Sequence, residues 1–466
     1  MAITSTKTTP VQSSSTAGGS YGPALAVLTT LFFIWGSLTS LNDVLIPFAQ
    51  HVFSLNLAES MLIQTAFFLA YFIISLPAAK IIDWIGYKRA IIVGLSTMVA
   101  ACLLVYPAAK IPSFPFFLAA LMVLAAGITV LQVAANPYVA VLGRPETASS
   151  RLNLTQAFNS LGTAVFPWVG ARLILGETVS AAAQAASQDA VIKLYVYFFA
   201  ILLVLLAILF AVFRLPKIES AERHAGEEIN DSIWKHPNLP LGAIGIFVYV
   251  GAEVAIGSSI ANYLALNNIG HFAQNVADPA ARYHAALAIA ARYISIYWLG
   301  AMVGRFIGSA ILQKLRTSTV LGFCAAVATL LVVVTVLSSG HFAMWSVLSI
   351  GLFNSIMFPS IFTSGIAELG PLTGDGSGLL NMAIVGGAVI PWVVGRIGDA
   401  INHAYYPSMI QGETSWGQGI HYALILTALC YLYILYYALS GSRPNSERYG
   451  NVDAARAVTT PAEARS

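Results

Sequence analysis

Residues 132–137 read Gln-Val-Ala-Ala-Asn-Pro and residues 354–359 read Asn-Ser-Ile-Met-Phe-Pro, so an amide stands five residues before a proline in two apolar stretches, 222 positions apart. A second pair repeats at nearly the same spacing, since 167–172 read Pro-Trp-Val-Gly-Ala-Arg and 391–396 read Pro-Trp-Val-Val-Gly-Arg. The second half of the chain therefore repeats the first. Parallel repeats with proline-interrupted membrane helices are typical of secondary transporters.

The chain is far more apolar than a soluble protein. Its 466 residues are 58% hydrophobic and 9% charged, whereas soluble domains are about 25% charged. Helices are expected because every backbone polar group needs a partner inside lipid. We predict an all-α polytopic membrane protein with two pseudo-symmetric six-helix bundles. Apolar runs of about 20 residues predict twelve spans, near 23–48, 58–79, 89–108, 113–141, 152–175, 191–213, 240–266, 286–312, 318–338, 341–366, 377–398 and 418–439.

A charged segment without an apolar run divides the chain. We predict a cytoplasmic linker at 214–237, an N-terminal bundle at 23–213, a C-terminal bundle at 238–440, and disordered cytoplasmic tails at 1–22 and 441–466. Lys and Arg accumulate on the cytoplasmic side of membrane proteins. With the N-terminus inside, 17 of the 23 Lys and Arg residues fall on the inner side. Both termini are therefore expected in the cytoplasm.

The first predicted helix carries an acid. Asp43 follows Asn42, and Trp35 lies on the same helical face. A charge near the bilayer centre costs about 2.5–3.5 kcal/mol, so its presence needs a reason. We predict that Asp43 couples transport to a cation, H⁺ or Na⁺, and that Trp35, Asn42 and Asp43 contact the substrate. The alternative is that Asp43 lies in water at the outer helix end.

Four amides form two pairs at helical spacing. Gln132 and Asn136 stand at i, i+4, and Gln156 and Asn159 stand at i, i+3, so each pair projects to one side of its helix. Amides donate and accept hydrogen bonds, as a neutral polyol requires. They also join membrane helices to one another. We predict a substrate-binding wall, to which the second half contributes Asn262, Asn354 and Asn381.

Glu253 is the second acid inside a predicted helix. Two uses stay open for it: a structural contact, for example with Arg305, and the binding of a ligand or of the coupling cation.

A cluster of charges at 80–89, between the second and third predicted helices, suggests a latch. It contains Asp83, Gly86, Lys88 and Arg89, and Arg305 belongs to its looser counterpart after the eighth helix. Such clusters can hold two bundles together in one state and separate in another. The alternative is charge that only sets the topology.

The segment from Asp83 to Arg89 resembles the signature between helices 2 and 3 of the major facilitator superfamily, although Trp84 replaces the usual arginine. The whole chain resembles the fucose, galactose and glucose symporter group of that superfamily. The residues that carry this likeness lie in both halves, at 32–36, 41–43, 132–138, 156–162 and 251–254.

This resemblance implies a sugar transporter of the bacterial inner membrane, in which the acid matching Asp43 takes part in proton coupling and substrate binding. Fucose permease has a glutamate at the position matching Gln132. Because Gln132 does not titrate, coupling is expected to rest on Asp43 alone or to use Na⁺ near Asp43. The same change favours glucose, galactose or N-acetylglucosamine over fucose.

The function predicted from these features is import of a neutral hexose by cation symport, through alternating access, by a monomer. A proton-coupled exporter of drugs or other small molecules is the alternative, and it would need fewer amides. Cys102, Cys324 and Cys430 lie in apolar helices and form no metal or disulfide pattern. Without a phosphate loop or a catalytic set, we expect no enzyme activity, no cofactor beyond the coupling ion and no nucleic-acid partner.

Overall fold

The computed structural model describes residues 21–53, 62–111, 113–170, 189–216, 231–277, 279–405 and 417–444. Ten helical segments in this part are long and apolar enough to cross a membrane. One of them, Leu62–Ala108, has 47 residues, enough for two crossings. A further crossing is α5 (Ala148–Gly170), which is less apolar because it carries amides. The predicted all-α fold with twelve crossings is confirmed.

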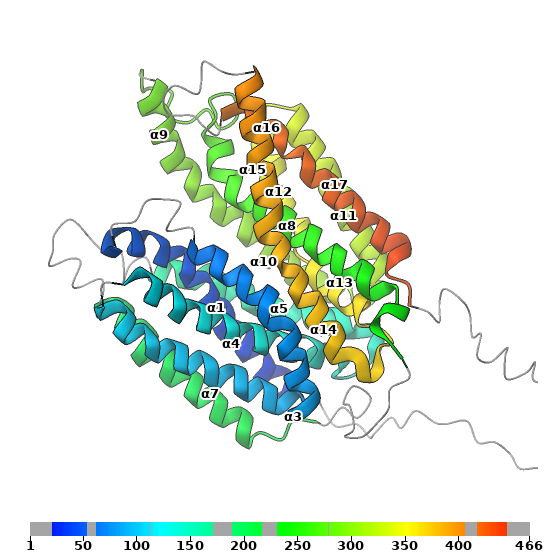
Figure 1. The fold of residues 1–466 in the computed structure, drawn as a ribbon. Coiled ribbons are helices and arrows are strands. Elements are labelled where there is room, and N and C mark those ends of the chain that lie inside the picture. The colour runs from blue at the N-terminus through cyan, green and yellow to red at the C-terminus, as the bar shows by residue number, and fades with distance from the viewer. Residues whose placement is uncertain are drawn as a thin grey trace, which may run out of the picture.

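Two helix bundles make up the fold (Figure 1). The N-terminal bundle consists of α1 (Gly22–Phe53), α3 (Leu62–Lys110), α4 (Phe114–Val141), α5, η3 (Lys193–Phe199) and α7 (Ala200–Val212). The C-terminal bundle consists of α8 (Asn238–Ala265), α9 (Pro279–Ala290), α10 (Ile294–Ile311), α11 (Thr317–Leu337), α12 (Gly340–Asn354), α13 (Met357–Gly365), α14 (Thr373–Met382), α15 (Gly386–Tyr405), α16 (Gly417–Ala423) and α17 (Ile425–Tyr436). The predicted tails at 1–22 and 441–466 lie mainly outside the described residues.

The predicted loop at 80–89 is wrong in extent. Helix α3 runs through it and is interrupted only at Gly86, whose φ of 77° and ψ of 166° are not helical. This backbone conformation suits glycine because it has no Cβ. One residue therefore separates the second crossing from the third.

Two glycines, Gly162 and Gly386, stand five residues before the prolines of the second repeat, Pro167 and Pro391, and explain how each bundle packs. A Cβ on Gly162 of α5 would lie 2.4 Å from the carbonyl oxygen of Phe33 in α1, and a Cβ on Gly386 of α15 would lie 2.0 Å from the carbonyl oxygen of Phe247 in α8. Only glycine lets two membrane helices approach this closely. The same close helix–helix contact therefore occurs once in each bundle, beside each copy of the second sequence repeat.

The bundles meet at one end, which we call the linker end; it carries Gly86 and the first residues of α5 and α8. Helix α10 packs against α5 there, and α14 packs against α3 and α4. Hydrogen bonds join Ser149 to Thr363 at 2.6 Å and Ser150 to the carbonyl oxygen of Ser309 at 2.7 Å. Figure 1 shows the bundles diverging from this end toward α9. The structure is therefore closed at the linker end.

Candidate functional site

The amides of α4 and α5 come together as predicted from their spacing. Gln156 lies beside Asn136, with Nε2 3.5 Å from Oδ1, and both side chains are buried. The Nδ2 group of Asn136 has no partner among the described residues. Asn159 turns to α1, where its Nδ2 donates to the carbonyl oxygen of Phe32 at 3.0 Å. Asn136 and Gln156 thus keep hydrogen-bonding capacity for a ligand, while Asn159 also ties α5 to α1.

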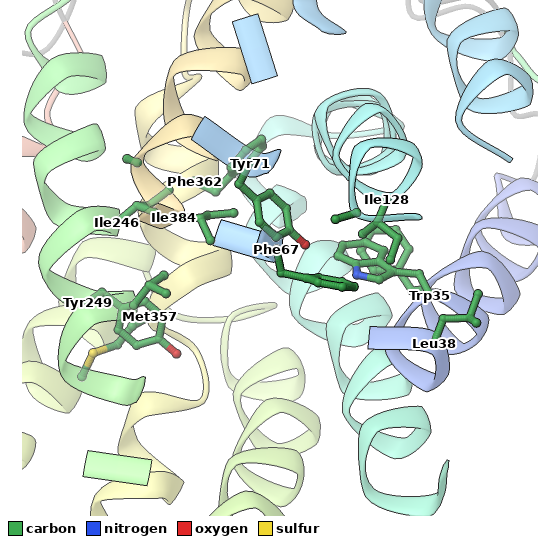
Figure 2. Packing of buried hydrophobic residues seen from close by; sticks show 14 of the residues in the cluster. Trp35, Leu38, Phe67, Tyr71, Ile128, Ile246, Tyr249, Met357, Phe362 and Ile384 are labelled. Carbon is green, nitrogen blue, oxygen red and sulfur yellow. The ribbon is translucent and has the colours of Figure 1, made fainter. Parts of the chain in front are cut away.

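Gln132 is held by a residue that the sequence did not single out. Its Nε2 donates to the hydroxyl of Tyr71 in α3 at 2.6 Å. Figure 2 shows Tyr71 and Phe67 on the same side as Trp35, which is 5% exposed and packs on Phe32 with ring centroids 4.8 Å apart. The N-terminal bundle therefore combines aromatic rings with amides, a surface suited to a sugar.

Asn42 and Asp43 belong to α1. Their side chains lie outside the described part of the chain, so their predicted contacts stay predictions.

The predicted amides of the second half are scattered. Asn262 accepts from the hydroxyl of Tyr283 at 3.1 Å, within the C-terminal bundle. Asn381 is buried and donates to the carbonyl oxygen of Ser377 at 2.9 Å, one turn earlier in α14. Asn354 is buried and donates to the hydroxyl of Tyr297 at 2.8 Å. Among the described residues, none of these three amides hydrogen-bonds to the amides of α4 and α5, although Asn381 contacts the Ser377 hydroxyl that donates to Val133 of α4.

Asn354 instead belongs to a tyrosine cluster around Glu253. The hydroxyl of Tyr249 donates to the Asn354 carbonyl oxygen at 3.1 Å, and the hydroxyl of Tyr297 lies 3.4 Å from the carbonyl oxygen of Glu253. Tyr431 faces this group from α17. Single tyrosines in apolar helices give no sequence signal, so this cluster was not predicted.

Arg305 lies within α10 and not with the charges near Gly86. Its Nε donates to the Ser355 carbonyl oxygen at 3.0 Å, and its Nη1 contacts the Ser160 hydroxyl and, at 3.5 Å, the Gln156 carbonyl oxygen. Ser160 and Gln156 belong to the other bundle, so Arg305 joins the two bundles beside the amides.

The charges near Gly86 have separate partners. Lys88 donates to the carbonyl oxygen of Ala211 at 2.9 Å, inside its own bundle, and Arg89 is exposed. Asp83 lies 3.4 Å from Lys80, and Lys80 forms a 2.8 Å ion pair with Asp375 at the first turn of α14. Among the described residues, an ion pair between the bundles thus joins Lys80, the first residue of the predicted cluster, to Asp375, which the sequence interpretation had not chosen.

The prolines of the repeated motif explain two of these contacts. Proline has no N–H and leaves the carbonyl four residues earlier without its helical donor. These carbonyls belong to Val133, before Pro137, and to Ser355, before Pro359. Ser377 of the C-terminal bundle donates to Val133 at 2.7 Å, and Arg305 donates to Ser355. The Val133 carbonyl thus accepts a hydrogen bond across the bundles. The Ser355 carbonyl accepts from Arg305 of its own bundle, and Arg305 in turn contacts Gln156 and Ser160 of the other bundle.

Comparisons with known proteins agree with this architecture. Residues 25–391 match the Major Facilitator Superfamily. The chain is 46% identical to a glucose/galactose transporter of Brucella abortus, over 93% of this chain and 98% of that protein. It is 31% identical to the L-fucose-proton symporter of Escherichia coli, over 82% of this chain and 88% of that one.

A solved structure shares both the fold and the sequence. The crystal structure of FucP, a Major Facilitator Superfamily transporter in the outward conformation, has a TM-score of 0.76 at 29% identity and covers 91% of this chain and 100% of its own. These relatives are transporters, not enzymes, and they cross the membrane several times. The chain belongs to the Major Facilitator Superfamily.

Proposed function

We propose that this protein imports a neutral hexose of the glucose and galactose type, by symport with a cation through alternating access, and needs no cofactor besides that ion. The observation that carries the proposal is the buried group of Gln132, Asn136 and Gln156, in a bundle that also buries the ring of Trp35. Amides match sugar hydroxyls, and an apolar sugar face packs on an aromatic ring. The relatives' names, glucose/galactose transporter and L-fucose-proton symporter, support the same substrate class.

The substrate site is proposed at the contact between bundles. Asn136 and Gln156 would bind hydroxyls, because their polar groups lie at the level where Arg305 joins α10 to α5. Asn159 would bind from the adjacent turn of α5. Asn262, Asn354 and Asn381, which hydrogen-bond within the C-terminal bundle, would act by shaping that bundle.

Asp43 is proposed as the coupling acid on α1, with Asn42 as its neighbour in the site. A carboxylate in a closing, dry cavity is costly when charged, so Asp43 would bind a cation before the loaded carrier reorients. Glu253 is proposed as a second coupling acid.

The linker end is proposed to face the cytoplasm, because it carries most Lys and Arg residues. Both termini would then be cytoplasmic in a bacterial inner membrane, and a single chain would suffice for transport. The closed linker end makes the present state outward-facing, with Lys80, Asp375 and Arg305 in the latch that must open.

Uptake of radiolabelled glucose into proteoliposomes tests the proposal. An imposed inward proton gradient is compared with an inward Na⁺ gradient, and galactose, fucose and N-acetylglucosamine serve as competitors. We expect accumulation with one ion, which identifies the coupling cation, and strongest competition by galactose. Absence of sugar uptake and of competition under both gradients would refute hexose import and leave a proton-coupled exporter as the better assignment.

A further inference from the structure

The C-terminal bundle encloses an acid with an unused oxygen. Glu253 is 8% exposed, and its Oε1 has no hydrogen-bond partner among the described residues. The same holds for the Asn354 Oδ1 and the Tyr431 hydroxyl, and both of these side chains are fully buried. Unsatisfied buried polar groups are rare and need an explanation.

These groups belong to one cluster. From α8 itself, Tyr249 faces the Glu253 carboxyl; from α10, Tyr297 and Arg305 face it; from α17, Tyr431 does so. Asn354 of α12 links them, since it donates to Tyr297 and accepts from Tyr249 through its carbonyl oxygen. Arg305 is thus the one cation among the described groups that face Glu253.

Arg305 is nevertheless engaged elsewhere. Its guanidinium donates to the carbonyl oxygens of Ser355 and Gln156 and contacts the Ser160 hydroxyl, and it forms no ion pair with Glu253 in the described part of the chain. A buried carboxylate without a paired charge costs several kcal/mol. A neutral, protonated Glu253 avoids this cost, and its O–H is a donor for an acceptor such as the Tyr249 hydroxyl oxygen.

A metal cation fits this cluster less well. The positive charge of Arg305 acts on Glu253 and repels a second cation. The four described tyrosine and arginine neighbours also bring hydroxyl and guanidinium donors, which suit a carboxyl group better than Na⁺.

We propose that Glu253 is a proton-binding site whose occupancy is controlled by Arg305. While the linker end is closed, Ser160 and Gln156 hold Arg305, and Glu253 carries the proton. When the linker end opens, these acceptors leave with the N-terminal bundle. Arg305 then pairs with Glu253, and the proton passes from the carboxyl group to water on the linker side.

This inference rests on the proposed cation symport. In each transport cycle Glu253 would carry one proton, and its release would not require contact between Glu253 and the sugar. The exchange of partners is a two-state element of the kind that alternating access requires.

Infrared difference spectroscopy of the purified full-length protein tests the proton directly. We expect a protonated-carboxyl C=O band at neutral pH that is lost in Glu253→Gln and kept in Glu146→Gln, a matched change at a glutamate that is 68% exposed. Ser160→Ala releases Arg305 and should weaken the band without altering Glu253. A spectrum of Glu253→Gln identical to that of the wild type would overturn the proposal.

Transport then separates this inference from the proposed function. In proteoliposomes, Glu253→Gln should lose one proton from the number carried per sugar, whereas sugar exchange without a gradient persists. Unchanged proton stoichiometry would exclude Glu253 as a coupling site and leave hexose import intact. If the wild type moves no hexose, the proposed function fails, and the infrared band still decides whether Glu253 holds a proton.

Discussion

The two bundles share their packing and differ in their chemistry. In both, a glycine lets two helices meet backbone to backbone, and in both a proline frees a carbonyl oxygen that accepts a hydrogen bond from a side chain of the C-terminal bundle. One polar pair is repeated, because Gln132 donates to the Tyr71 hydroxyl and Asn354 donates to the Tyr297 hydroxyl. The difference is the acid: the C-terminal bundle places Tyr249 and Glu253 side by side, and the N-terminal pair has no such acid beside it in the described part of the chain.

This difference indicates a division of labour. Neutral amides such as Gln132 and Gln156 bind hydroxyls without changing charge, so the N-terminal bundle is suited to substrate. An acid that faces an arginine bonded to the other bundle can be charged or neutral according to the position of that arginine, so the C-terminal bundle is suited to the proposed coupling. Duplication explains the shared backbone, and later divergence of side chains explains the separate tasks.

The largest effect is expected where the bundles are alike. Gly162→Val and Gly386→Val each force a side chain into a backbone carbonyl 2.4 Å or 2.0 Å from the new Cβ. Overpacking costs about 1–3 kcal/mol and more against rigid backbone. We expect both variants to lose most folded protein, measured as the monodisperse peak of detergent-purified protein by size-exclusion chromatography.

Gly322→Ala is the matched control, because its Cβ would meet its nearest neighbour at an ordinary 3.6 Å. Wild-type yield is expected for this variant. If only one of the two valine variants lost its folded peak, the contacts of α5 with α1 and of α15 with α8 would not be equivalent. The two bundles would then not share their packing.

The second prediction concerns chemistry and is smaller. Gln156→Ala removes an amide from the proposed sugar site and should weaken glucose binding about tenfold, as expected for one hydrogen bond of about 1.4 kcal/mol. Asn354→Ala leaves the Tyr297 hydroxyl without its donor and should lower thermal stability with little change in glucose affinity. Calorimetric titration and thermal unfolding of both variants measure the two effects. Equal loss of affinity in both would show that the bundles share the substrate site.

The fold could be predicted well from the sequence because membrane-spanning helices are recognisable as apolar runs of about 20 residues. The predicted start of the C-terminal bundle at 238 coincides with the first residue of α8. The loop at 80–89 was misjudged because charges at a membrane surface do not reveal whether the helix continues, and only the backbone angles of Gly86 show the break.

The site was predicted in part. Amides at i, i+3 and i, i+4 were recognisable because they are rare in membrane helices. Tyr71, Ser160 and Ser377 were missed, since a lone hydroxyl in an apolar helix becomes significant only when another helix approaches it. Arg305 was noticed both as part of a latch and as a neighbour of Glu253, but its contacts with Gln156 and Ser160 were not predicted, because a sequence does not show which bundle an arginine reaches.

The third prediction tests the carbonyl oxygens that the two repeated prolines leave without a helical donor. Pro137→Ala and Pro359→Ala restore an N–H that competes for the carbonyl oxygens of Val133 and Ser355. The effect of Pro359→Ala should be larger, because hydrogen bonds from a charged donor such as Arg305 contribute about 1.5–3 kcal/mol and neutral ones about 1 kcal/mol. Hydrogen–deuterium exchange at the first turns of α5 and α14 should be faster in both variants than in the wild type, and fastest in Pro359→Ala.

Pro145→Ala is the control, since this proline precedes α5 in η1 and lies outside both copies of the motif. Exchange at the linker end should not change in it. Slower exchange in either repeat variant would contradict the view that the exposed carbonyls stabilise the closed state.

The smallest effect on stability is expected in the linker, the segment of chain that connects the two bundles. Asp231 accepts a 2.7 Å hydrogen bond from the ring of His236, just before α8, and this bond holds the pKa of Asp231 below its ordinary value. A lowered folded-state pKa stabilises the protein above the unfolded-state pKa, about 3.9, and this stabilisation is lost as the pH falls through the folded-state pKa. Because the Asp231 carboxylate is 43% exposed, water screens the interaction, so the loss of stability is small.

Unfolding temperatures measured from pH 7 down to the acid range test this prediction. The wild type should show a decrease at acid pH. The decrease should be smaller in Asp231→Asn and unchanged in Asp399→Asn, a control at an exposed acid of α15. Identical acid profiles for the wild type and Asp231→Asn would mean that the start of the C-terminal bundle is fixed by α8 packing, with no contribution from the linker.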